Sequence, residues 1–301
     1  MTIEDRFEGC ILCGAIGDAW GSAYEGADQN LEDDLYYPFG IPDEIQKVWR
    51  ITDDTQLTLA TIDAITNNDK LKAENIAEEI LKLYRTKKIR GLGASTLKAL
   101  EELNFGGHWS QVGRKGEYAA GNGAAMRIAP LAFLPNISDE LIREICSITH
   151  QNDEAYIGAL SIVKAIRLII DNKWTGKENL IRLIVEGIPD SRVRDRLILI
   201  DTLNELNDIC GLGNSAYVVD SVPLAIAFAS RIKDLGVKDM FQSIINAGGD
   251  TDTNCALAGQ IVGALVGIKG IPEELKIKLG ELEDYDWIIS NIEKFKNERN
   301  K

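Results

Sequence analysis

Hydrophobic positions along the chain recur with the period of an α-helix, and the alternation of apolar and polar residues typical of strands is almost absent. Amphipathic stretches of this kind occur at 73–86, 139–150, 193–206 and 221–232, and again in PEELKIKLGEL and DYDWIISNIEKFKNER near the C-terminus. Each places apolar side chains three or four residues apart, as a helix with one buried face requires. The pattern therefore predicts an all-α fold.

Two of these helices also carry residues that favour a helix start. Ser138 directly precedes 139–150. Pro223 lies near the beginning of 221–232, a position where its missing N–H costs little.

Three further segments, 7–24, 55–66 and 255–268, are apolar or small nearly all round, which is typical of central, buried helices. The first contains Gly9, Gly14, Gly17 and Gly21, and the last contains Gly259, Gly263 and Gly267. Each glycine costs roughly 1 kcal/mol of helix propensity relative to alanine, which a helix tolerates where a neighbour approaches closely. We therefore expect a tightly packed central pair or trio of helices, surrounded by the amphipathic ones.

Composition and charge narrow the class of protein. The 301 residues contain no Pro/Gly/Ser-rich linker, so we expect one domain over 1–301. The net charge of -14 argues against nucleic acid or an anionic membrane as the main partner. The first apolar stretch follows no basic region and is interrupted by Asp18, so it predicts neither a signal peptide nor a membrane span. No pattern indicates an obligate dimer, and we expect a monomer.

The five cysteines are scattered and odd in number, which predicts reduced thiols and a cytoplasmic protein. Cys10 and Cys13 form a CxxC motif. They lie in a Gly/Ala-rich apolar stretch without a preceding strand, so we interpret them as buried small residues rather than as a redox or metal site.

Candidate chemistry gathers at the beginnings of two of the core-type helices. Thr52, Asp53, Asp54 and Thr55 precede one apolar run, and Asp250, Thr251, Asp252, Thr253 and Asn254 precede another. Asp252 or Thr253 suits an N-cap, and capping alone stays open for each cluster. A cap needs only one such residue, however. If the two helix starts lie side by side, the carboxylates converge and favour Mg²⁺, Mn²⁺ or Ca²⁺.

Two other motifs that begin at Asp250 fail on spacing. An EF-hand loop needs glycine at its sixth position and glutamate at its twelfth, where this chain has Cys255 and Ile261. A phosphatase-like DxDx(T/V) motif should follow a strand and have Thr or Val fifth, whereas here NAGG precedes it and Asn254 is fifth.

Additional candidates lie in three other segments. Asp18, in the middle of an apolar helix, needs hydrogen-bond partners, and we predict a structural role for it. Glu25 follows that helix and can reach a cleft.

The turn of Gly121, Asn122 and Gly123 precedes a predicted helix and can present N–H groups to an anion. Arg127 is either a phosphate contact or a structural ion pair. His150 is either a ligand contact or a structural residue.

Five segments in this order resemble the ADP-ribosylglycohydrolase family: GAIGDAWGSAYE, TDDTQLTLA, GNGAAMRIAPLAF, THQNDEAYIGAL and AGGDTDTNCALAGQIVGALVG. The resemblance implies an all-α fold with two Mg²⁺ or Mn²⁺ ions in a cleft. It implies metal ligands from Thr52, Asp53 and Asp54 at one helix start, and from Asp250, Asp252 and Thr253 at the other. Glu25 matches an acidic residue near the metals, and Gly121, Asn122, Gly123 and His150 match positions that line an ADP-ribose cleft.

The reaction implied is hydrolysis at the anomeric carbon of ADP-ribose, through an oxocarbenium-like transition state. Glu25, Asp54 and Asp252 are the candidates for the carboxylate that steers the attacking water, and the choice among them stays open. The partner would be an ADP-ribosylated protein or a small ADP-ribose conjugate. ADP-ribosyl-arginine is preferred by analogy; ADP-ribosyl-serine, poly-ADP-ribose and O-acetyl-ADP-ribose remain alternatives. Because the family also has non-enzymatic relatives, an ADP-ribose-binding or crystallin-like structural protein is the rival interpretation.

Overall fold

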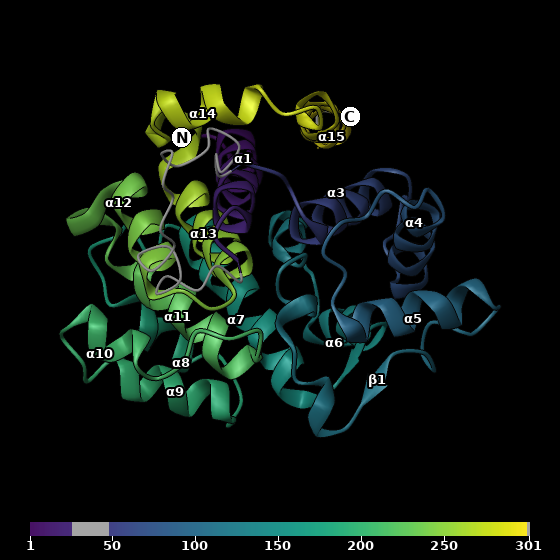
Figure 1. Ribbon diagram of the computed structural model, residues 1–301, viewed down its shortest axis with the longest axis horizontal. Helices are drawn as coiled ribbons and strands as arrows, with labels where there is room; N and C mark the ends of the chain where they lie inside the picture. The colour runs from purple at the N-terminus through teal and green to yellow at the C-terminus, as the bar shows by residue number, and fades with distance from the viewer. Residues whose placement is uncertain (26–47, 300–301) are drawn as a thin grey trace, which may run out of the picture.

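Two long helices run side by side through the centre of the computed structural model, which describes residues 1–25 and 48–299 (Figure 1). They are α1 (Ile3–Ser22) and α13 (Thr251–Gly270), which come from opposite ends of the chain. On one side of this pair lie α7 to α12, and on the other lie α3 to α6 (Figure 1). Helices α14 and α15 pack at one end of the pair, near the N-terminus.

The remaining helices are α3 (Asp53–Thr66), α4 (Ala73–Arg85), α5 (Ala94–Asn104), α6 (Asp139–Ser147), α7 (Asp153–Ile170), α8 (Leu180–Val185), α9 (Arg192–Ile200), α10 (Leu206–Cys210), α11 (Val218–Ser230), α12 (Ile232–Ala247), α14 (Glu273–Gly280) and α15 (Tyr285–Arg299). Short 3-10 turns occur at η2 (Glu117–Ala119), η3 (Asn122–Ala124) and η4 (Ala129–Phe133). In the described residues the strands are β1 (Arg114–Lys115) and β2 (His150–Gln151), which pair in parallel with Arg114 opposite His150. The predicted all-α class is confirmed, and the helices share one core within a single domain.

The central pair packs backbone against backbone, as its glycines predict. A Cβ atom added to Gly17 would overlap the carbonyl oxygen of Cys255, and one added to Gly263 would overlap that of Gly9. Cys10 and Cys13 lie in α1 as buried free thiols, so the interpretation of this CxxC as small core residues is confirmed. Gly267 departs from the regular helix expected over 255–268, because its φ of +64° puts a kink into α13.

Several predicted boundaries hold and others shift. Helix α6 starts at Asp139, as predicted, and its N-cap Ser138 accepts from the N–H of Leu141 at 3.2 Å. Helix α11 starts at Val218, three residues earlier than predicted, because Val218 and Val219 are buried and extend the helix into the core. Pro223 therefore lies inside α11 and not in its first turn.

Helix α9 is also shorter than the 193–206 stretch, since it ends at Ile200. The side chain of the next residue, Asp201, pairs with Arg182 at 2.8 Å and accepts from Asn179 at 2.6 Å. Among the described residues no single helix is long and apolar enough to cross a bilayer. Only α13 together with α14 reaches that hydropathy, and this pair is bent by 102°.

The close contact between α1 and α13 leads to a stability prediction. We expect Gly17→Ala to lower the free energy of unfolding by about 1–3 kcal/mol, because overpacking against the Cys255 backbone outweighs the gain in helix propensity. Chemical denaturation measures the change. Gly280→Ala is the matched control: no atom lies within 4 Å of its added Cβ, and we expect a change within about 0.5 kcal/mol. Equal effects of the two substitutions would contradict the packing argument.

Candidate active site

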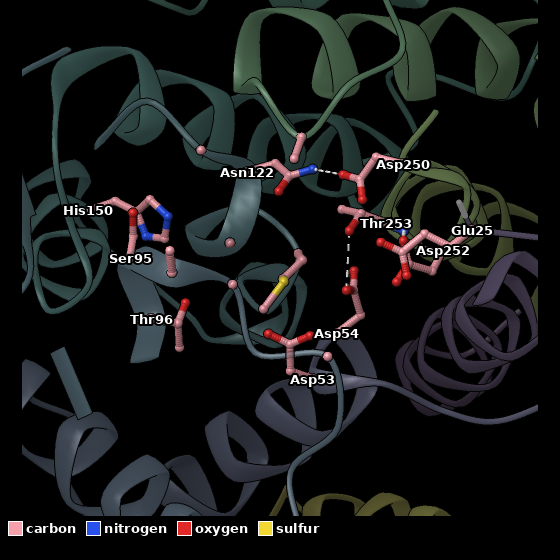
Figure 2. A pocket seen from close by; sticks show the side chains of 17 residues that line it. Glu25, Asp53, Asp54, Ser95, Thr96, Asn122, His150, Asp250, Asp252 and Thr253 are labelled. Atoms are coloured by element: carbon pink, nitrogen blue, oxygen red, sulfur yellow. Dashed lines mark hydrogen bonds between the residues drawn. The ribbon is translucent and has the colours of Figure 1, made fainter. Parts of the chain in front are cut away.

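The N-termini of α3 and α13 meet, so the two Asp/Thr clusters converge. Thr253 Oγ1 donates to Asp54 Oδ2 at 3.2 Å across the gap between the helices (Figure 2). Helix α13 begins at Thr251 with Asp250 in the N-cap position, two or three residues earlier than the predicted cap at Asp252 or Thr253. The reason is that Gly248 and Gly249 both adopt positive φ and turn the chain sharply before Asp250.

Asp18 anchors the start of α3 from within α1. Its carboxylate accepts from the backbone N–H of Thr52 at 3.0 Å and of Thr55 at 3.1 Å, and from both threonine hydroxyls at 2.8 Å and 2.5 Å. The predicted structural role is confirmed. Burial raises the pKa of Asp18 to about 6, although the threonine hydrogen bonds act in the opposite direction. The first turn of α3 is therefore fixed to the central helix pair.

A cavity of about 270 Å³ opens between these helix starts and the loops around them. The predicted site residues that line it are Glu25, Asp53, Asp54, Gly121, Asn122, Gly123, His150, Asp250, Asp252 and Thr253. Figure 2 shows Asp53 and Asp54 on one side of the cavity, with Asp250, Asp252 and Glu25 on the other. Thr52 is not among the lining residues, since its hydroxyl donates to Asp18 and caps α3 by accepting from the N–H of Asp54.

Burial, and after it the charges of neighbouring carboxylates, raises the pKa values of the converging acids. Desolvation, and after it the charge of Asp250, raises the pKa of Asp252 to about 9. Burial raises the pKa of Asp53 and of Asp54 well above the ordinary value, with further contributions from neighbouring aspartates. Glu25 is affected in the same way, by desolvation and by Asp250.

These acids lack a cationic partner among the described side chains. In residues 1–25 and 48–299, no Lys, Arg or His forms an ion pair with any of the lining carboxylates. Asp54 Oδ1 is buried and accepts no hydrogen bond from the described residues. One oxygen each from Glu25, Asp250 and Asp252 lies within 4.8 Å of the other two. Hard oxygen ligands short of positive charge fit a divalent cation such as Mg²⁺ or Mn²⁺.

The Gly121–Gly123 turn forms the wall opposite α3. Asn122 Nδ2 donates to Asp250 Oδ2 at 2.5 Å, which ties the turn to the start of α13. A Cβ on Gly121 would lie 3.1 Å from the His150 ring, and one on Gly123 would lie 2.9 Å from it, so the turn leaves bare backbone beside the imidazole. No α-helix follows, contrary to the prediction. The chain continues instead through the short turns η3 and η4, and every residue of η4 is buried.

His150 lines the cavity as a neutral side chain. Burial, with contributions from Arg127 and Arg114, lowers the pKa of the imidazole to about 3. Its Nδ1 is 2.7 Å from Thr149 Oγ1. At neutral pH the ring therefore contributes shape and hydrogen bonding rather than a mobile proton.

The structure corrects the prediction of a direct ligand contact for Arg127. This side chain is fully buried and does not line the cavity. It donates to the carbonyl oxygen of Gly123 and, at 2.8 Å, to Thr149 Oγ1. Among the described residues the ion-pair alternative is not realised either, since the hydrogen-bond partners of Arg127 there are uncharged. Because 3-10 turns replace the expected helix, the guanidinium extends behind the glycine turn and supports it.

The segment RGLGAST, residues 90–96, also lines the cavity and was not predicted from the sequence. Gly91, Gly93, Ala94, Ser95 and Thr96 face the ligand space where α5 begins. A Gly-x-Gly turn that leads into a helix with Ser and Thr in its first turn presents free N–H groups to an anion. The criterion applied to Gly121–Gly123 would have identified this segment as well. Met126 and Ala216 complete the lining and have no such signal.

Comparisons with known proteins agree on one relationship. A family model described as ADP-ribosylglycohydrolase matches residues 1–301. An uncharacterized protein of Archaeoglobus fulgidus is 31% identical, over 93% of this chain and 97% of its own. Human ADP-ribosylhydrolase ARH3 is 26% identical, over 95% of this chain and 92% of its own. ADP-ribosylarginine hydrolase Tri1 of Pseudomonas putida is 28% identical, over 90% of this chain and 73% of its own.

A solved structure described as an ADP-ribosylglycohydrolase-related protein complex has a TM-score of 0.73 and covers 98% of each chain at 23% identity, which shows a shared fold.

The raised pKa values predict how stability depends on pH and on cations. A carboxylate with a raised folded pKa stabilises the protein below its unfolded pKa of about 4, and this contribution is lost as pH rises through the folded pKa. For Asp252 the loss extends to about pH 9. Without divalent cations we therefore expect Tm to fall between pH 5 and about 8.5. Mg²⁺ should reverse this fall, with an effect that grows with pH because the cation competes with protons.

Thermal unfolding in chelator and in excess Mg²⁺, across this pH range, provides the measurement. The difference between the two curves removes the contribution of groups outside the site. Curves that coincide at every pH would contradict the assignment of a cation site to these carboxylates.

Proposed function

The chain belongs to the ADP-ribosylglycohydrolase family, and on this basis we propose that it is a metal-dependent hydrolase that releases ADP-ribose from an ADP-ribosylated protein or a small ADP-ribose conjugate. The observation that carries the proposal is the convergence of carboxylates from two helix starts on one cavity, with Asp54 Oδ1 buried and without a hydrogen-bond donor. A protein that only binds ADP-ribose has no need for this accumulation of negative charge.

The proposed cofactor is a pair of Mg²⁺ or Mn²⁺ ions. Asp53 and Asp54 would hold them from α3, and Asp250, Asp252 and Thr253 from α13. The family resemblance adds Thr52, whose hydroxyl is turned toward Asp18 in the structure. Bound divalent cations supply a water of lowered pKa and a Lewis-acid contact for ribose hydroxyls.

The side chains around the cavity suggest how the reaction is organised. Water adds to the anomeric carbon of ribose while the glycosidic bond breaks, and the acceptor leaves with the bonding electron pair and takes up a proton. Glu25, Asp54 and Asp252 are the candidates to orient that water and to take its proton. Glu25 lies at the cavity mouth, whereas Asp54 and Asp252 are buried.

The ADP portion would be held by backbone rather than by charged side chains. The Gly121–Gly123 turn and the start of α5 at Ala94–Thr96 line the same cavity, and an exposed helix N-terminus favours a diphosphate. Neutral His150 would pack against the ligand beside the glycine turn.

For the acceptor we propose ADP-ribosyl-arginine, because the similar Pseudomonas putida protein is named an ADP-ribosylarginine hydrolase. Serine-linked, poly-ADP-ribose and O-acetyl substrates are alternatives for the same assay. The charge of -14 and the free thiols support the further proposal of a cytoplasmic monomer.

A single substitution tests the metal-dependent reaction. We expect Asp252→Asn to reduce release of ADP-ribose by about a hundredfold or more, because replacing a metal ligand should cost at least as much as losing the residues that orient one. Free ADP-ribose is measured with ADP-ribosyl-arginine peptide and Mg²⁺, with and without chelator. Asp190 lies just before α9, and its side chain is 96% exposed. Asp190→Asn is therefore the matched control and should retain wild-type activity.

Unchanged turnover in Asp252→Asn, or release that resists the chelator, would contradict the proposal. If the wild-type protein binds ADP-ribose by calorimetry but cleaves none of the four substrates, the protein is a binder and not a hydrolase.

A further inference from the structure

The loop of residues 86–93, called here the covering loop, is held by its backbone against the first turn of α3. The carbonyl oxygen of Arg90 accepts from the N–H of Asp53 at 2.7 Å. The amide of Gln56, which is 2% exposed, accepts from the N–H of Arg90 at 2.9 Å and donates to the carbonyl of Lys88 at 3.1 Å. The loop thus takes both hydrogen bonds of a buried glutamine and satisfies a free N–H at the helix start.

Beyond Arg90 the loop passes directly over Asp53. Gly91 has a φ of +81°, and a Cβ at this position would lie 3.2 Å from Asp53 Oδ1. The backbone N–H of Gly93 donates to the carboxylate of Asp53. The residues that follow, up to Thr96, form the cavity wall where α5 begins. The path of this loop therefore determines both the orientation of Asp53 and the shape of one wall.

The opposite side of the covering loop is fixed by a distant part of the chain. Arg90 Nη1 pairs with Asp284 Oδ2 at 2.8 Å, and Nη2 pairs with Glu283 Oε1 at 2.5 Å. Both acids lie in the turn between α14 and α15. Asp284 is 18% exposed and Glu283 is 80% exposed. Since exposed ion pairs contribute little, Asp284 is the partner expected to matter.

We propose that Arg90 is a positioning residue for the candidate active site, held by Asp284 so that the covering loop keeps Asp53 directed into the cavity. The importance of Arg90 for catalysis rests on the proposed function, whereas the contacts that hold the covering loop are all made by residues of this chain. The planar guanidinium suits the role, because its fork contacts two acids at once while the same residue's backbone holds α3. A residue that served only stability would not change how the site binds a cation.

Amide hydrogen exchange of the metal-free protein is the first test, since it needs neither substrate nor cofactor. We expect Arg90→Met and Asp284→Asn to speed exchange at the amides of Asp53 and Arg90 by about tenfold, as these two N–H groups are held by the covering loop. Glu283→Gln is the matched control, because it removes the exposed partner of the same arginine. Asp201→Asn is the second control, since it removes a comparable ion pair with Arg182 on the other side of the molecule.

Calorimetry with Mn²⁺ is the second test, and it separates positioning from general stability. We expect the Kd for Mn²⁺ to rise about tenfold in Arg90→Met and in Asp284→Asn, the lower end of the range for residues that orient metal ligands. In both controls the Kd should stay at the wild-type value. Arg90→Lys keeps the charge and should recover part of the affinity. With saturating Mn²⁺ and substrate, kcat should change less than about threefold, because the ligands themselves are intact.

The proposal is overturned if Arg90→Met leaves both the exchange rates and the Mn²⁺ affinity at wild-type values, or if Asp201→Asn changes them equally. Failure of the proposed hydrolase activity is a separate result, because neither test requires turnover. Should wild-type protein bind no Mn²⁺, the exchange rates together with the Kd for ADP-ribose decide: faster exchange with weaker ADP-ribose binding in Arg90→Met supports positioning, and no change in either overturns it.

Discussion

The backbone contact between α1 and α13 is the constraint on which the site depends. Gly17 allows α1 to touch the carbonyl of Cys255, and Gly21 continues the contact as far as Thr251. There the hydroxyl of Thr251 donates to the carbonyl of Gly21 at 2.8 Å, which fixes the first turn of α13. On the same helix Asp18 fixes the first turn of α3. Helix α1 therefore holds both helix starts, and their separation cannot change without breaking this contact.

Holding the helix starts together forces carboxylates into a partly buried space where each disfavours the ionisation of its neighbours. Desolvation, and after it the charges of neighbouring acids, raises the pKa values of Asp53, Asp54 and Asp252, so ionising these carboxylates costs free energy. A divalent cation offsets it by supplying the missing charge. The buried guanidinium of Arg127 supports the glycine turn instead. For this reason we expect stability and cation binding to be coupled.

Around this rigid centre, the remaining walls of the cavity come from loops tied to it by single side chains. Asn122 joins the glycine turn to Asp250, and Gln56 joins the covering loop to α3. Arg90 then extends the connection to the turn before α15. Loops carry the ligand-facing backbone, while helices carry the carboxylates, so ligand shape and charge are controlled by different parts of the chain.

The sequence by itself determined the helical class, the central glycine-rich helices, the structural role of Asp18 and the two Asp/Thr clusters, because each of these is recorded in local spacing or composition. It misplaced the cap of α13, the start of α11 and the surroundings of Arg127, and it missed the wall at Gly91–Thr96. Only the tertiary structure decided that Asp54 and Thr253, 199 residues apart, lie in contact, and that Arg90 meets Asp284. The physical reason is that periodicity and capping reflect interactions within one or two turns, whereas contacts between distant segments depend on how whole helices pack.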